Sequence, residues 1–95
     1  SLEAEYHRKI NKDVAPLFFE RAQVAFKTHF LDDALGFVSS AVELEDSLKD
    51  AWLLKGKLHF INGEFQEALK ALKKSGTTHH IISLSEKYKD VKKDR

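Results

Sequence analysis

Residues 51–72 read AWLLKGKLHFINGEFQEALKAL, and the same pattern of large and small side chains occurs 34 residues earlier in the chain. The pair Ala34-Leu35 recurs identically as Ala68-Leu69. A fixed period of 34 residues predicts one helix–turn–helix unit that is used twice. The remaining equivalent positions match in size, because Phe18, Ala22, Phe26, Leu31 and Val38 correspond to Trp52, Gly56, Phe60, Phe65 and Leu72.

The N-terminal residues carry a short apolar stripe of their own. Leu2, Tyr6 and Ile10 are spaced four apart, which is typical of one helix face. Polar residues 11–13 interrupt this stripe, and Pro16 suits the first turn of a new helix. We therefore expect a polar, helical extension over 1–13 that is separate from the helix after it.

The two repeats follow this extension. The first repeat is expected over 14–48, with a tight turn at His29 between its two helices. The second repeat is expected over 49–76, and its turn is marked by Asn62-Gly63, because both residues tolerate a positive φ. Both repeats are expected to bury small residues where their helices meet, Ala34 in the first and Ala68 in the second.

The chain after Gly76, a residue that suits a helix end, has a third amphipathic pattern. Residues 77–95 are expected to form a C-terminal capping helix with a basic tail. Its apolar stripe is expected to pack on the second repeat, and it consists of Ile81, Leu84, Tyr88 and Val91. With this helix, the chain is predicted to be all-α and to contain five or six helices.

Length and composition limit the class of protein. Ninety-five residues make at most one small domain, and the chain has no cysteine. The lack of cysteine excludes disulfides and thiolate metal sites, and it favours the cytoplasm or another reducing intracellular compartment. No apolar run has the length of a membrane span, so we expect no membrane insertion. The chain begins with Ser1, and we expect it to be a segment of a longer protein.

The charges are divided unevenly along the chain. Residues 13–48 contain seven acidic and two basic residues, whereas residues 49–95 contain six acidic and eleven basic residues. The simplest interpretation is two solvated helical surfaces of opposite sign. The alternative is a charge polarity that steers a partner or favours head-to-tail self-association with a second copy.

Residues 51–72 resemble a tetratricopeptide repeat (TPR), a family of stacked helical hairpins. The resemblance rests on the aromatic Trp52, the small Gly56, the Asn-Gly turn and the Ala68-Leu69 pair, and it extends more loosely over residues 15–82. The chain departs from the family pattern at Arg21 and Lys55, where that pattern has Leu, and at His29, where the turn usually has Gly.

The resemblance implies an all-α fold, in which helix–turn–helix repeats stack as a short right-handed superhelix, an α-solenoid. It also implies a concave groove lined by the first helix of each repeat. The residues that would face this groove are Phe19, Gln23, Phe26 and Lys27 in the first repeat and Leu53, Lys57, Phe60 and Ile61 in the second.

No pattern in the sequence indicates chemistry. His79-His80 are adjacent and would point in different directions on a helix, and His59 lacks further ligands nearby in the sequence, so we expect no metal site. No phosphate-binding loop or catalytic constellation occurs, and we expect neither a cofactor nor an enzyme. Asp90 and Asp94 dilute the basic tail, and we therefore expect no nucleic acid partner.

The sequence thus favours a protein–protein interaction module, a scaffold or adaptor that binds a peptide or helix of a partner protein in the groove. Two alternatives remain. The segment could belong to a longer structural solenoid or a self-associating repeat unit, or it could be the targeting domain of a larger enzyme.

Overall fold

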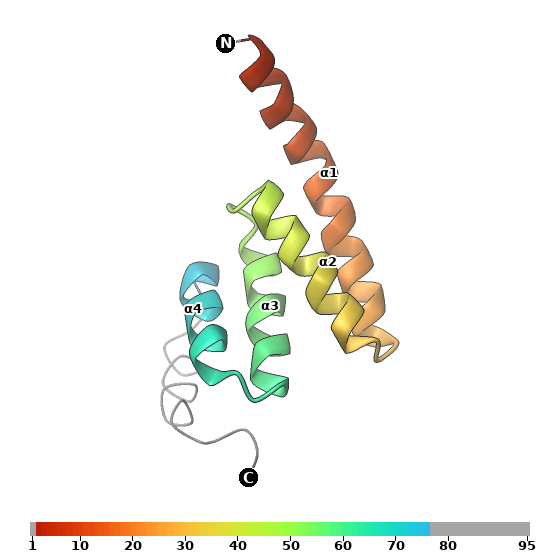
Figure 1. Ribbon diagram of the computed structural model, residues 1–95, viewed down its shortest axis with the longest axis vertical. Helices are drawn as coiled ribbons and strands as arrows, with labels where there is room; N and C mark the ends of the chain where they lie inside the picture. The colour runs from red at the N-terminus through yellow and green to blue at the C-terminus, as the bar shows by residue number, and fades with distance from the viewer. Residues whose placement is uncertain (1, 77–95) are drawn as a thin grey trace. The chain divides into compact units, whose positions relative to one another are not determined.

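The computed structural model describes residues 2–76, which form four α-helices in two compact units that divide after Leu48. Helices α1 (Leu2–Lys27) and α2 (Leu31–Leu44) make the first helical hairpin. Helices α3 (Lys49–Ile61) and α4 (Phe65–Ser75) make the second (Figure 1). The part of the chain that the structure describes contains no strand, so the all-α prediction is confirmed there, whereas superhelical stacking of the repeats stays a prediction.

Small side chains allow α1 and α2 to pack closely. Ala22 of α1 and Ala34 of α2 are fully buried, as the 34-residue pattern predicts for helix contacts. Such residues let two helix backbones approach to about 8–10 Å. The core of this hairpin is completed by Ala15, Ala25, Val38, Ala41 and Val42.

The second hairpin uses the equivalent positions in the same way. Ala68 is fully buried, and Gly56 lies directly against the side chain of Leu72. A Cβ atom at Gly56 would lie 2.8 Å from both Cγ and Cδ2 of Leu72 and 3.3 Å from the carbonyl oxygen of Ala68. The glycine is therefore needed for the close approach of α3 and α4.

The two hairpin turns have the same hydrogen bonds. In the first, the backbone N–H of Phe30 donates to the carbonyl of Ala25 at 2.9 Å, and the N–H of His29 donates to that of Phe26 at 3.2 Å. In the second, equivalent bonds join residues 64 to 59 at 2.9 Å and 63 to 60 at 3.0 Å. This is the Schellman arrangement of a helix C-terminus. Its recurrence after 34 residues confirms both predicted turns.

The residue that reverses the chain is left-handed in both turns. His29 has φ 68° and Gly63 has φ 78°. A glycine adopts this conformation without steric cost, whereas a residue with a Cβ atom is strained there. His29 therefore keeps the geometry of the turn although it departs from the family pattern. Gly76 also has φ 69°, as predicted for a helix end.

The predicted boundary between the extension and the first repeat is wrong as a helix boundary. α1 runs without interruption from Leu2 to Lys27, with Pro16 inside it. Asn, Lys and Asp in a helix each cost well under about 1 kcal/mol, so residues 11–13 do not force an end. Arg8 and Lys12 also line one hollow of about 300 Å³ with acidic residues near the end of α2, and attraction between these opposite charges favours the longer helix.

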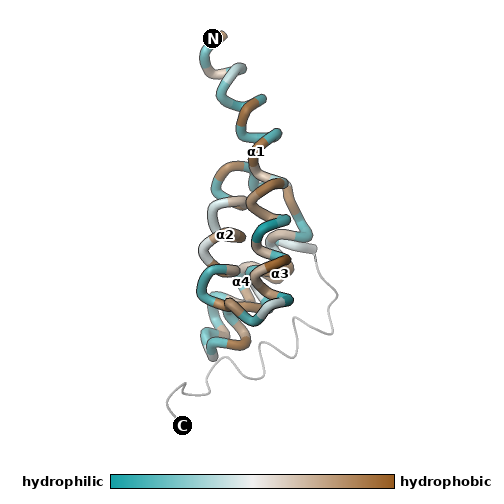
Figure 2. The backbone as a smooth tube through the Cα atoms, turned by 90° about the vertical axis from the view of Figure 1, so that its right-hand side faces the viewer, coloured by the Kyte–Doolittle hydropathy of each residue, from teal (hydrophilic) through white to brown (hydrophobic). Residues whose placement is uncertain are grey.

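The expected number of five or six helices changes accordingly. The expected N-terminal helix is part of α1, and the expected capping helix over 77–95 lies outside the described residues. Figure 2 shows apolar and polar segments that alternate along α1 up to its N-terminal end. None of the four described helices is long and apolar enough to cross a membrane.

Candidate interaction surfaces

The predicted groove residues of the first repeat share one face of α1. Phe19 and Phe26 are half-buried, and Gln23 and Lys27 are exposed. Their spacing of four, three and one residues corresponds to neighbouring positions on a helix. This face therefore presents two aromatic rings beside an amide and an ammonium group.

The predicted groove residues of the second repeat have similar exposure on α3. Leu53 and Phe60 are half-buried, Lys57 is exposed, and Ile61 is 53% exposed. The ring of Phe60 makes an edge-to-face contact with Phe65, with 5.1 Å between the ring centres. This contact orients Phe60 within its own hairpin. A single groove that contains both sets of residues stays a prediction.

The first hairpin also contains an open groove that the sequence reasoning did not predict. It has a volume of about 660 Å³ and lies between α1 and α2. Leu17 and Val24 are each 58% exposed there, and Phe30, in the turn, is 63% exposed. Exposed apolar residues that gather in one hollow are typical of an interaction site. We call this hollow the first-hairpin groove, and its apolar lining is Leu17, Val24, Ala25, Phe30 and Phe37.

Charged side chains border the first-hairpin groove. Glu20 and Arg21 come from α1 and Asp33 from α2, so two of the three charged lining residues are acidic. Glu20 and Asp33 are both exposed. The border is therefore suited to an occupant that carries basic groups beside an apolar stripe.

An apolar stripe continues from the groove to the N-terminal end of α1. Leu2, Tyr6 and Ile10 are exposed by 87%, 64% and 40%, and helical spacing places them on the same side as Leu17 and Val24. The signal was present in the sequence, because Ile10, Leu17 and Val24 are seven residues apart. The expected interruption at residues 11–13 divided this stripe into two unrelated pieces.

Trp52 is the aromatic residue on which the family resemblance begins, and two lysines contact it. The Nζ atoms of Lys55 and Lys74 lie 5.2 Å and 4.8 Å from the ring centre. A cation over an indole ring is attracted by its electron-rich face. Lys55 stands where the family pattern has Leu, and this contact gives the departure a structural role.

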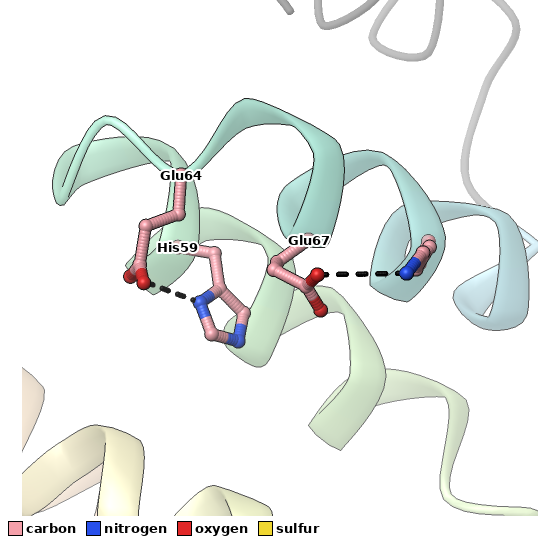
Figure 3. Close-up of polar contacts among 4 residues, drawn as sticks. His59, Glu64 and Glu67 are labelled. Carbon is pink, nitrogen blue, oxygen red and sulfur yellow. Dashed lines mark hydrogen bonds and ion pairs between the residues drawn. The ribbon is translucent and has the colours of Figure 1, made fainter. Parts of the chain in front are cut away.

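His59 pairs with an acid in the second turn. Its Nδ1 atom lies 3.3 Å from Oε1 of Glu64, and this contact joins the end of α3 to the residue before α4 (Figure 3). Nearby, Lys70 donates to Glu67 at 3.5 Å on the surface of α4. Within residues 2–76, no group of three His, Asp or Glu side chains could hold a metal ion. The predicted pair His79-His80 lies outside the described residues.

Comparisons of the chain with protein-family models, with curated proteins and with solved structures match nothing.

Proposed function

We propose that this chain is a protein-interaction module made of two TPR-like hairpins, which binds a peptide or helix of a partner protein. The binding surface is formed by the first helix of each hairpin. Apolar anchors of the ligand contact the aromatic residues there, and an acidic group of the ligand meets Lys27 or Lys57. The proposed surface comprises Phe19, Gln23, Phe26, Lys27, Leu53, Lys57, Phe60 and Ile61.

The observation that carries this proposal is the repetition of one hairpin geometry. The same two turn hydrogen bonds and the same left-handed residue recur after 34 residues. A 34-residue helical hairpin with small residues at its helix contact is the unit from which TPR proteins are built. Stacked units of this kind create extended concave binding surfaces.

The chemistry of the exposed side chains supports the same conclusion. Each first helix combines a half-buried phenylalanine with an exposed lysine, Phe26 with Lys27 and Phe60 with Lys57. An aromatic anchor beside a solvated cation is suited to a ligand segment with apolar and acidic residues. Two repeats offer a small surface, so we expect dissociation constants of about 1 μM or weaker.

Selection from a displayed library of random peptides tests this proposal. Selected peptides are expected to combine apolar residues with Asp or Glu. The substitution Lys57→Glu should abolish their binding without a change in melting temperature, because an exposed charge contributes little to stability. Binding should also weaken as salt concentration rises.

Lys70→Glu is the matched control, because Lys70 is an exposed lysine on α4, 73% exposed and outside the proposed surface. Peptides should bind this variant as well as they bind the unmodified chain. Equal loss in both variants would show a general effect of charge, and retention in Lys57→Glu would remove this lysine from the binding surface.

A further inference from the structure

The first-hairpin groove leaves apolar side chains exposed that helical proteins normally cover. Leu17, Val24 and Phe30 are each more than half exposed, and they lie on the walls of one hollow. The groove is separate from the proposed peptide surface, since it contains none of the predicted residues Phe19, Gln23, Phe26 and Lys27. Its occupant must match apolar walls and an acidic border.

A second α1 helix is a poor occupant. One edge of the α1 stripe carries Lys9, Asp13, Glu20 and Lys27. Antiparallel pairing about Leu17 would superimpose the apolar residues of two copies, but it would also place Asp13 beside Glu20 and Lys9 beside Lys27. Like charges at neighbouring helix positions are unfavourable. The stripe is therefore not complementary to itself.

Residues 77–95 of the chain have the complementary pattern. With helical spacing, the stripe of Ile81, Leu84, Tyr88 and Val91 would be bordered by Lys87 and Lys92. The acidic residues of this segment would fall on the opposite side, and they are Glu86, Asp90 and Asp94. An apolar stripe with a basic border matches an apolar groove with an acidic border.

The charges of the two hairpins favour the first as the docking partner of this segment. Residues 2–48 contain nine acidic and five basic residues, whereas residues 49–76 contain three acidic and six basic residues. Residues 77–95 contain three acidic and five basic residues. Their packing on the second hairpin, expected from the sequence, would bring like charges together.

We propose that residues 77–95 of one copy dock in the first-hairpin groove of a second copy. The contact is head-to-tail: the tail stripe covers Leu17, Val24 and Phe30, and Lys87 and Lys92 meet Glu20 and Asp33. Because the contact joins two different surfaces, each chain keeps one free groove and one free tail. Such heterologous contacts produce rings or open chains rather than closed dimers.

Charge reversal in the full chain tests this contact. We use a groove variant, Glu20→Lys with Asp33→Lys, and a tail variant, Lys87→Glu with Lys92→Glu. The unmodified chain should assemble as its concentration rises from about 10 μM to about 1 mM, the range of weak interfaces. Each variant alone should associate at least about tenfold more weakly, and an equimolar mixture should regain assembly because opposite charges face again. Sedimentation velocity measures all four samples.

The mixture separates this proposal from a loss of folding or from a symmetric dimer. A variant that fails to fold cannot regain assembly when it is mixed. Self-association by the tail variant equal to that of the unmodified chain would contradict the proposal, and so would a chain that stays monomeric throughout the concentration range.

Cysteine cross-linking locates the contact, because the chain has no cysteine of its own. Val24→Cys combined with Leu84→Cys should form a disulfide between chains on mild oxidation. Gln23→Cys with Leu84→Cys is the control, since Gln23 is also exposed on α1 but lies outside the groove. Equal cross-linking in both, a disulfide within one chain, or preferential cross-linking of Leu84→Cys to Lys70→Cys on the second hairpin would each contradict the proposal.

Discussion

At the scale of single residues, the two hairpins fill the same contact with different volumes. The first has Ala22 on one helix and Val38 on the other, and both are fully buried. The equivalent residues of the second are Gly56 and Leu72. The smaller residue on one helix is matched by a larger residue on the other. Close-packed interiors require this compensation, because they tolerate neither overlap nor voids.

Gly56→Ala should destabilise the chain. Its Cβ atom would overlap Leu72, and overpacking costs about 1–3 kcal/mol, of which the better helix propensity of Ala offsets about 1 kcal/mol. The double variant Gly56→Ala/Leu72→Val reproduces the pair of the first hairpin and should recover most of the loss. Thermal and urea unfolding measure the coupling, which we expect to be about 1 kcal/mol. Strictly additive effects would show that the two sites are not packed as described.

Gly36→Ala is the control for glycine itself. Gly36 lies inside α2, and a Cβ atom there meets nothing within 4 Å. Alanine should therefore raise the free energy of unfolding by about 0.5–1 kcal/mol. A rise at position 36 with a fall at position 56 would separate packing from helix propensity.

The turn residues provide a second residue-scale prediction. His29→Gly should raise the free energy of unfolding by several tenths to about 1 kcal/mol, because it relieves the left-handed strain but also makes the unfolded chain more flexible. Gly63→Ala should lower it by about 1 kcal/mol, since it introduces the same strain. Chemical denaturation of both variants checks the opposite signs. Changes of the same sign would contradict the equivalence of the two turns.

At the scale of helices, the sequence predicted the parts that have strong local signals. The spacing of 34 residues located both turns, and it identified Ala34 and Ala68 as buried contacts. It failed at residues 11–13, where single residues weakly disfavour a helix and contacts with the end of α2 decide the outcome. The first-hairpin groove was missed for the same reason, because its stripe crosses that boundary.

Pro16→Ala tests the continuity of α1. Inside a helix, Pro16 cannot donate a hydrogen bond to the carbonyl of Lys12, and a proline there costs about 3 kcal/mol relative to alanine. Alanine should therefore increase the helicity of residues 2–13 and slow their amide exchange. Cα chemical shifts and hydrogen exchange measure both effects. If Pro16 instead began a separate helix, the substitution would leave residues 2–13 unchanged.

At the scale of the whole molecule, the account rests on one hairpin that is used twice and presents equivalent residues from each copy. The sequence predicted the all-α fold of the described residues because period and composition agree on it. It also nominated eight surface residues through a family resemblance, and their function stays a prediction. Local periodicity reports which residues share a helix face, but it does not report what binds there.

The most direct test of the central claim, that the first helices of both hairpins form one binding surface, is an NMR titration of the full chain with a selected peptide. We predict that amide shifts change together on α1 and α3, at Gln23 and Lys27 and at Lys57 and Ile61. The shifts should follow one binding curve, because one ligand contacts both helices. Changes confined to α2 and α4, or to the opposite face of α1 at Leu17 and Val24, would contradict the claim.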